Sequence, residues 1–319
     1  MFFSKMQALG NDFVIVDLRA SNAVTVDAPL AKWVSDRRRG VGCDQLLILK
    51  SSNSADLSME IYNADGSVAE ACGNGARCVA WLWMTQHDKR EVSLQVHDRI
   101  LHAWLKGEHG VSIDMGQPCF DEALTNQVRD NAFKGFEYRP DASSVMGNNL
   151  NNSECLFADE AYNHSKNTIS QINANTGGRT RIPWDASSPA TFVSMGNPHL
   201  VVESSVVGDT CANDILSHTK EIFPDGVNIE WLRVLDSLNI SIKIYERGVG
   251  ETHACGTGAC AAAVVAISSG RCESSVTVSM LGGQVDVSLG ETAVLTGEVS
   301  FVFSGEIDYS ATCICRDSQ

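Results

Sequence analysis

The 319-residue sequence has no long hydrophobic run and little proline, with 7 prolines against 26 glycines. Its longest apolar stretch, Ala259 to Ile267, is rich in alanine. A bilayer span needs roughly 20 apolar residues, so we predict no membrane segment. The first residues, MFFSKMQALGNDF, lack the charged start, apolar middle and small-residue cleavage site of a signal peptide. We therefore expect no export.

Positive charge is also scarce. The chain has 24 Lys and Arg against 39 Asp and Glu, a formal net charge of −15. Such a field repels a phosphate backbone and an anionic membrane surface. The short run Arg37 to Arg39 is expected to face water at a helix end, where it suits the helix dipole. We expect a small-molecule substrate, and neither nucleic acid nor a membrane, as the partner.

Paired cysteine motifs are missing, although cysteine itself is not. The 11 cysteines are an odd number, spread along a long chain without a CxxC pair, which argues against a disulfide scaffold. A reducing cytoplasm fits this usage better. The closest pairs are not at zinc-site spacing, so we expect no metal; these pairs are Cys72 with Cys78, Cys255 with Cys260, and Cys313 with Cys315.

What the sequence does contain is an internal repeat. MEIYNADGSVAEACGNGARCVA at 59–80 matches IKIYERGVGETHACGTGACAAA at 242–263 in 8 of 22 positions without a gap. Two weaker matches lie upstream in the same order: GNDFVIVD from Gly10 with GNPHLVVE from Gly196, and DQLLIL from Asp44 with VNIEWL from Val227. Three matches in register indicate a duplicated fold.

Each half is expected to mix helix and strand. The first half has strand patterns at 13–17, 45–49 and 59–63, a turn at 65–66, and a helix after Cys72. In the second half, isoleucines at 240, 242 and 244 alternate as in a half-buried strand, and 256–267 is apolar on every side, which indicates a buried helix. The predicted fold is therefore α+β: two pseudo-symmetric mixed α/β halves, each a sheet wrapped around a central helix, with the active site in the cleft between them.

The same patterns suggest how the chain is divided. We expect an N-terminal half at 1–118 carrying Cys72, and a C-terminal half at 191–304 carrying Cys255. Strand patterns near 276–280, 285–287 and 301–303 are expected to complete the C-terminal half. Between the halves, 119–190 is an asparagine-rich connector with an extra insertion, and its composition favours loops and turns.

Two cysteines stand apart because the repeat places both at a strand-to-helix turn, each followed by Gly-x-Gly. A helix N-terminus beside glycines exposes backbone N–H groups, leaves room for a ligand and lowers a thiol pKa, so Cys72 and Cys255 are candidates for chemistry. The others that we considered are expected to pack as small hydrophobic residues; these are Cys43, Cys78, Cys119, Cys211 and Cys260.

Two like residues facing one cleft suit the inversion of a stereocentre, in which one group removes a proton and another delivers one to the opposite face. Half-ionisation near pH 7 requires a thiol pKa shift of about 1.5 units, or ~2 kcal/mol. A helix N-terminus supplies ~0.3–1 kcal/mol, rising to ~2 in partly buried geometry. Nearby groups must therefore help. The backbone N–H groups at the two helix starts are positioned to hold a substrate carboxylate; they belong to Gly73, Asn74, Gly256 and Thr257.

At this point the sequence resembles a known family. NADGSVAEACGNGAR, from Asn63 to Arg77, is similar to the signature of the diaminopimelate epimerases. The resemblance extends over both halves and leaves out the connector and the extreme C-terminus. It is carried by GNDF at 10–13, GCDQ at 42–45, MGNPH at 195–199, GVN at 226–228 and YERGVGETHACGTGA at 245–259.

The resemblance implies that Cys72 and Cys255 are the acid/base pair and interconvert LL- and meso-diaminopimelate without pyridoxal phosphate or another cofactor, in lysine and peptidoglycan precursor synthesis. His199 and Glu246 would assist the proton transfers. The chain near 305–316 would return to complete the N-terminal half. A homodimer is a further expectation. The residues that would contact substrate are Asn11, Gln45, Asn63, Asn197, Asn228, Glu246 and Arg247.

Some features depart from the family pattern. The connector is long, Thr257 stands where Ser is common, and Leu200 stands where Cys is common. Three alternatives stay open: another cofactor-independent amino-acid racemase, a two-lobed amino-acid-binding protein without catalysis, and a thiol oxidoreductase. Arg247 disfavours the first, because an unpaired guanidinium in a dry pocket is costly. The paired cysteines disfavour the second, and the missing CxxC disfavours the third.

Overall fold

A computed structural model describes residues 1–19, 25–69, 72–133, 190–204 and 212–308. The contacts within the chain divide it into two compact units, and neither is a single continuous segment. The first consists of Met1–Gln117, His253–Cys260 and Met280–Gln319, and the second of Pro118–Thr252 and Ala261–Ser279.

The first unit is built on strands paired in the order β17, β1, β2, β3, β4, β5, β6, β7, β16, β15. The β2–β3 and β4–β5 pairs are parallel and the others are antiparallel. The strands are β1 (Phe2–Ala8), β2 (Asn11–Asp17), β3 (Gln45–Lys50), β4 (Leu57–Asn63), β5 (Glu91–Val96), β6 (Arg99–Lys106), β7 (Gly110–Asp114), β15 (Gly283–Leu289), β16 (Ala293–Glu298) and β17 (Ser300–Glu306).

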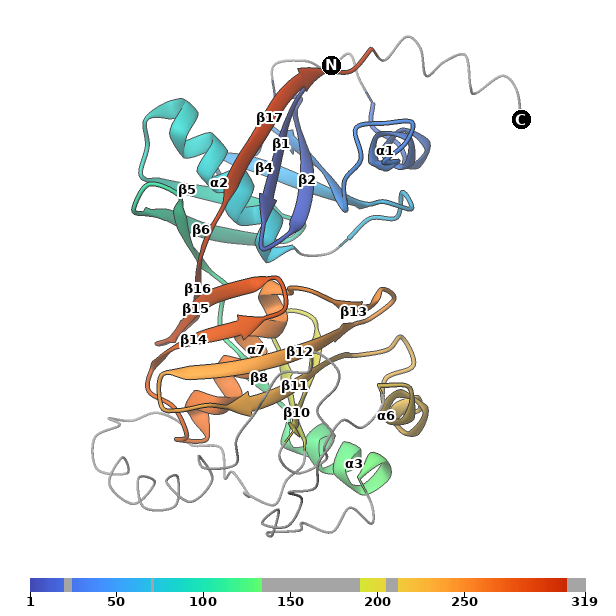
Figure 1. Cartoon of the computed structure of the whole chain (residues 1–319), viewed down its shortest axis with the longest axis vertical. Coiled ribbons are helices and arrows are strands. Elements are labelled where there is room, and N and C mark those ends of the chain that lie inside the picture. Colours follow the sequence, from blue (N-terminus) through green and yellow to red (C-terminus); the bar gives the residue numbers. More distant parts are fainter. Residues whose placement is uncertain (20–24, 70–71, 134–189, 205–211, 309–319) are drawn as a thin grey trace, which may run out of the picture. The chain divides into compact units, whose positions relative to one another are not determined.

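Two helices belong to this unit. Helix α1 (Ala28–Ser35) begins at Asp27, whose side chain accepts a hydrogen bond from the Leu30 N–H at 3.0 Å. Helix α2 (Gly73–His87) contacts β1, β2, β5, β6 and β7, and Figure 1 shows it lying across the strands. Residues 73–80 are all buried, so α2 is the predicted central helix with the sheet wrapped around it.

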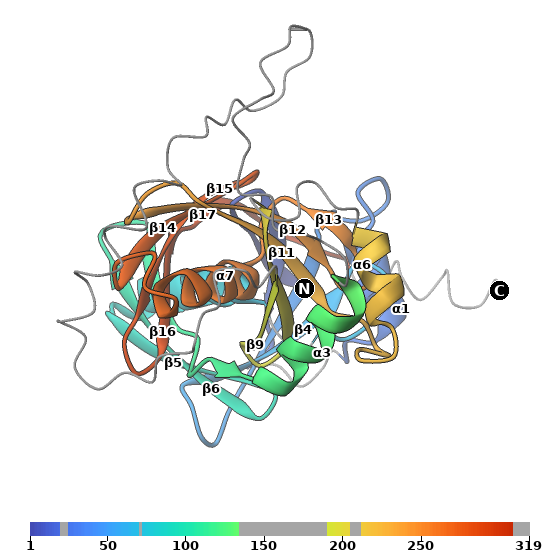
Figure 2. The same ribbon diagram turned by 90° about the horizontal axis from the view of Figure 1, so that it is seen from below.

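The second unit repeats this plan. Its strands pair in the order β8, β9, β10, β11, β12, and β12 then pairs with β13 at one end and β14 at the other. Helices α3 and α6 lie next to one another in this unit (Figure 2). Its elements are β8 (Cys119–Phe120), α3 (Glu122–Ala132), β9 (Ala190–Ser194), β10 (Pro198–Glu203), α6 (Ala212–Thr219), β11 (Asn228–Val234), β12 (Asn239–Glu246), β13 (Gly250–Thr252) and β14 (Ser275–Met280).

The remaining helix, α7 (Gly256–Ser268), begins in the first unit and continues in the second. Every residue from 254 to 267 is buried, because the segment carries only small or apolar side chains. It lies beside β14 in both views (Figures 1 and 2). The expectation of a buried apolar helix at 256–267 is confirmed.

The strand registers confirm the duplication residue by residue. Parallel partners Phe13 and Gln45 correspond to His199 and Asn228, which are the positions that the sequence repeat aligns with them. The next two pairings repeat in the same way. Leu46–Tyr62 corresponds to Ile229–Tyr245, and Leu57–Leu94 corresponds to Ile240–Val278.

Parts of the connector and the chain end differ from expectation. The described part of the connector contains helix α3, which the asparagine content did not predict; Asp121 caps it by accepting from the Leu124 N–H, and Val128 packs in a core. Strand β17 pairs with β1, so the expectation that 301–303 completes the C-terminal half is wrong. Most of the expected returning segment at 305–316, and most of the connector at 119–190, lie outside the described residues.

The surroundings of the other cysteines also correct one expectation. Cys43, Cys78 and Cys260 are buried, as predicted for small hydrophobic residues. Cys119, the first residue of the two-residue strand β8, is exposed, so the prediction of burial is wrong there. Cys211 lies outside the described residues.

A charge cluster fixes the start of β2. Asp12 accepts hydrogen bonds from Lys5 Nζ at 2.6 Å and from both terminal nitrogens of Arg37 at 2.9 and 2.7 Å. Nη2 of Arg37 also donates a hydrogen bond to Oδ1 of Asp44 at 2.7 Å, so Arg37 forms ion pairs as well as being exposed to water. Burial alone would raise the pKa of Asp12, but the hydrogen bonds from Arg37 and Lys5 outweigh it and hold that pKa well below its ordinary value of 3.8.

This cluster predicts an acid-sensitive contribution to stability. Because the pKa of Asp12 is lower in the folded chain, its contribution is present above the unfolded value and is lost as the pH falls through the range below about 3.9. Asp12→Asn should therefore lower the free energy of unfolding by about 1–3 kcal/mol at pH 7, since hydrogen bonds to charged groups are lost. Urea denaturation at pH 7 and at pH 3 measures the difference, which should shrink at the lower pH. An equal difference at both values would contradict this account.

Candidate active site

The two helix starts singled out by the sequence have the same local geometry. Cys72 caps α2, and its sulfur accepts a hydrogen bond from the Gly75 N–H at 3.2 Å. The Cys255 sulfur accepts from the Gly258 N–H at 3.4 Å at the corresponding position of α7. Cys72 is partly exposed and Cys255 is buried. Hydrogen bonds from backbone N–H groups favour the charged form of an acceptor, so both positions suit a thiolate.

These helix starts meet at a pair of glycines within the first unit. A Cβ built on Gly256 would lie 3.4 Å from the Gly73 Cα and 3.6 Å from Oδ1 of Asn74. It would also lie 3.1 Å from Cδ2 of Leu295 on β16. Because Cys72 and Cys255 directly precede these glycines, the structure brings the two cysteine-bearing helix N-termini together.

Polar groups surround the sulfur atoms. The Cys72 sulfur lies 3.9 Å from Oδ1 of Asn11 on β2, and the Cys255 sulfur lies 3.4 Å from Oγ1 of Thr257. Asn74 and Thr257 are only 2% and 5% exposed.

Three other predicted residues of the first unit stand at strand ends. Gln45 begins β3 and Asn63 ends β4; they are register partners, and Gln45 Nε2 donates to Asn63 Oδ1 at 2.9 Å. Asn11 begins β2, and its side-chain amide donates to Asp44 Oδ2 at 3.0 Å. Each amide is thus held by a neighbour, which fixes its orientation before any ligand binds.

The second unit holds the other predicted residues. His199 on β10 and Asn228 on β11 are register partners. The Asn228 amide donates to the Pro198 carbonyl at 2.9 Å and accepts from the Arg247 N–H at 2.9 Å, which anchors the turn after β12. Glu246 accepts from the Thr252 hydroxyl at 2.6 Å. Asn197, His199, Asn228, Glu246 and Arg247 therefore form one group at the ends of β10, β11 and β12.

Sequence reasoning missed the partner that holds His199 in place. Glu230 Oε1 lies 2.7 Å from Nδ1 of His199, and both side chains are fully buried. The other ring nitrogen, Nε2, lies 3.0 Å from Oδ1 of Asn197. The signal in the sequence was a glutamate between the apolar residues of the strand pattern NIEWL.

Sequence reasoning also missed a second buried charged residue. Arg77 is the largest of the fully buried side chains, and it lies inside α2, five residues after Cys72. A cation within an apolar helix was a visible signal, because arginine is almost never fully buried unless it is paired.

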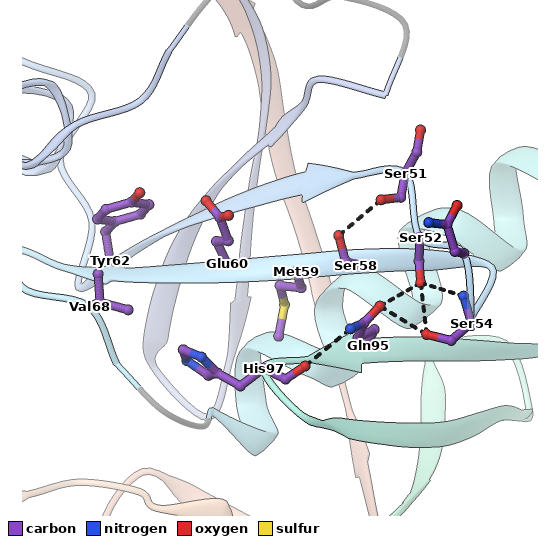
Figure 3. Close-up of a pocket in the computed structure, with 11 residues that line it drawn as sticks. Ser51, Ser52, Ser54, Ser58, Met59, Glu60, Tyr62, Val68, Gln95 and His97 are labelled. Carbon is purple, nitrogen blue, oxygen red and sulfur yellow. Dashed lines mark hydrogen bonds between the residues drawn. The ribbon is translucent and has the colours of Figure 1, made fainter.

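A separate hollow of about 580 Å³ lies along β4 and the end of β5 (Figure 3). Its serines and Gln95 bond to one another, with Ser52 donating to Gln95 Oε1 at 2.6 Å. None of the predicted site residues lines this hollow.

The described residues include neither a metal-binding cluster nor a helix that could cross a membrane. There, no three His, Cys, Asp or Glu side chains gather closely enough to hold a metal ion. Among the same residues, every helix is too short or too polar to cross a membrane.

Comparison with known proteins decides the family. The model of the family described as diaminopimelate epimerase matches residues 3–120 and 191–302. The chain belongs to the diaminopimelate epimerase family. A diaminopimelate epimerase of Rhizorhabdus wittichii is 34% identical over 315 residues, covering 97% of this chain and 96% of that protein. One from Neisseria meningitidis is 33% identical over 321 residues, covering 97% and 98%.

Solved structures share the fold of this diaminopimelate epimerase family member at low sequence identity. A phenazine biosynthesis protein of the PhzF family from Bacillus anthracis has a TM-score of 0.61 at 15% identity, covering 97% of this chain and 99% of that one. A hydroxyproline epimerase from Agrobacterium vitis has a TM-score of 0.57 at 13% identity, covering 96% and 91%. These likenesses confirm the predicted α+β fold of two pseudo-symmetric halves.

The glycine contact between the helix starts can be tested directly. Gly256→Ala should lower the free energy of unfolding by about 1–3 kcal/mol, because the added methyl group overpacks against Cδ2 of Leu295 at 3.1 Å while it also contacts the Gly73 backbone at 3.4 Å. Gly290→Ala is the matched control, since the nearest atom to its new Cβ is 3.9 Å away. Urea denaturation of both variants measures the effect. If the two variants are equally stable, the helix starts do not meet as described.

Proposed function

We propose that this chain is a cofactor-independent epimerase that interconverts LL- and meso-diaminopimelate, in the cytoplasm, on the route to lysine and peptidoglycan precursors. One observation carries the proposal: two cysteines of a diaminopimelate epimerase family member each precede the glycine at which the starts of α2 and α7 meet. The duplicated N–H to sulfur hydrogen bonds support the same conclusion.

In the proposed reaction one thiolate removes the α-proton from one face of the substrate carbon, and the opposite thiol donates its proton to the other face. The enzyme then holds the thiolate and thiol in exchanged positions, and proton exchange with solvent restores the starting state. Like charges that share a site resist ionising together, so one thiolate beside one thiol is the favoured resting pair. The same pair therefore serves both reaction directions.

The carbanion-like intermediate needs stabilisation as well. We assign this to the backbone N–H groups of Gly73, Asn74, Gly256 and Thr257, whose helix N-termini favour negative charge on a substrate carboxylate. Preorganised donors of this kind need no reorganisation when the charge develops.

The rest of the substrate is assigned to the amide and guanidinium groups at the strand ends. Arg247 offers a planar fork to the distal carboxylate. His199 and Glu246 assist proton transfer. The proposed contacts are Asn11, Gln45, Asn63, Asn197, Asn228, Glu246 and Arg247.

The cysteine pair predicts a specific loss of function. Cys72→Ala and Cys255→Ala should each reduce epimerisation of LL-diaminopimelate by at least 10³-fold, because each removes one of two required acid/base groups. Chiral chromatography of the product, with no cofactor added, measures the rate. Cys119→Ala, at an exposed cysteine, is the matched control and should keep wild-type activity. Substantial turnover by either Cys72→Ala or Cys255→Ala would refute the two-base assignment.

The same assay separates the alternative functions. A racemase for amino acids without a distal carboxylate would act on proline or alanine at least as well as on diaminopimelate. A non-catalytic binding protein would bind diaminopimelate without exchanging its α-proton for solvent deuterium.

We also propose that the enzyme is a homodimer formed through β17. Phe301, Val302 and Phe303 are 46%, 52% and 45% exposed, so this strand presents apolar side chains on both faces. Phe303 is packed edge-on against Phe3 of β1, with ring centroids 5.8 Å apart, so the exposed strand is firmly held. Contiguous exposed apolar surface of this kind is typical of a protein interface.

A charged substitution tests the dimer. Phe301→Lys should shift the mass in sedimentation equilibrium from two chains to one, because a lysine cannot be buried unpaired in an apolar interface. Leu281→Lys is the matched control, since Leu281 is 76% exposed outside β17. A wild-type protein that sediments as one chain, or a Phe301→Lys variant that remains a dimer, would contradict the proposal.

A further inference from the structure

Arg77 is a buried cation that the proposed reaction has not yet used. Its side chain is 0% exposed, and its Nη2 donates to Asn74 Oδ1 at 2.9 Å. The remaining nitrogens, Nε and Nη1, are buried without a hydrogen-bond partner. Among the described residues, no carboxylate forms an ion pair with Arg77. In the part of the chain that the structure describes, the buried guanidinium of Arg77 therefore has one hydrogen-bond partner, Asn74.

The fold provides space for the Arg77 guanidinium, but close packing does not require a charged group there. Gly297 on β16 has no side chain, and a Cβ there would lie 3.3 Å from Cζ and Nε of Arg77. An unpaired buried charge is costly, and replacing buried charges by apolar residues of similar volume is often neutral or stabilising. An arginine at this position is thus a poor choice for stability alone.

Three thiols interact electrostatically with Arg77. Burial lowers the pKa of Arg77, and interactions with Cys78, Cys72 and Cys260 oppose that effect. Burial also raises the pKa of Cys78, and it raises that of Cys260 to about 12, so both of these thiols stay neutral. Cys72 differs from them, because it is partly exposed and its sulfur accepts the Gly75 N–H.

Asn74 links this cation to both helix starts. Its Oδ1 accepts the Arg77 hydrogen bond and lies 3.6 Å from the position of a Cβ on Gly256. The guanidinium therefore fixes the second residue of α2 against the first residue of α7. Because the guanidinium is hydrogen-bonded to a residue in the first turn of α2, its charge adds to the positive end of the helix dipole.

We propose that Arg77 is a positioning residue for the epimerase site: its buried cation holds Asn74 between the two helix starts and is the counter-charge that stabilises the Cys72 thiolate. The inference rests on the proposed function only for what the thiolate does. A helix N-terminus alone barely supplies the free energy needed to ionise a thiol near neutral pH, and the Arg77 charge adds to it.

The test measures the Cys72 thiol directly and needs no turnover. Iodoacetamide alkylation of the folded protein is followed over pH 5–10, and the rate at the Cys72 peptide is read by mass spectrometry. In the wild type we expect a Cys72 pKa below the free-thiol value of about 8.5. Arg77→Met should raise it by about one unit or more, which is a tenfold loss of thiolate at neutral pH. Arg77→Lys, which keeps the charge, should retain most of the shift.

Two further readouts separate this role from a structural one. Arg77→Met should be at least as stable to urea as the wild type, and the acidic limb of its kcat/KM profile should move to higher pH. A wild-type Cys72 pKa at or above the free-thiol value overturns the inference without any variant. A folded Arg77→Met protein with an unchanged Cys72 pKa also overturns it. A wild type that does not turn over diaminopimelate, yet loses its low Cys72 pKa in Arg77→Met, would contradict the proposed function and support this inference.

Discussion

The contact between the starts of α2 and α7 is the constraint on which the rest of this structure depends. The first residues of the two helices, Gly73 and Gly256, lie close together: a Cβ on Gly256 would be 3.4 Å from the Gly73 Cα and 3.1 Å from Cδ2 of Leu295. The contact concentrates two positive dipole ends in one place, and each end carries a cysteine as its cap. Both helices are buried along their first turns, so the surrounding sheet holds them there.

Each of the two units buries polar side chains in its core. Arg77 is buried with two unpartnered nitrogens, and His199 with Glu230 forms a fully buried polar pair in the second unit. Buried polar groups weaken a fold unless they are fully satisfied. The proposed function accounts for their presence: a carbon acid of very low acidity needs thiols, donors and counter-charges that are in position before the substrate arrives.

The sequence was sufficient for the parts of the fold that repeat. The match between 59–80 and 242–263 predicted equivalent strands and helices, and the strand registers agree with it position by position. Patterns within one segment could not reveal contacts between distant segments. The pairing of β17 with β1, and the hold of Asp44 on Asn11, depend on the closed fold. Glu230 and Arg77 were visible as charges in apolar segments, but their partners were not, because a partner is defined only by packing.

In the proposed reaction, two different groups act on opposite faces of a single carbon. The most direct measurement is the isotope content of substrate and product during the first few per cent of reaction, with protiated LL-diaminopimelate in D₂O. If one thiol removes the proton and the other donates a solvent-derived deuteron, the meso product carries deuterium at the inverted carbon while the remaining LL substrate keeps its protium. Early product that retains the substrate's own proton would show that a single group moves it across, and would contradict the account.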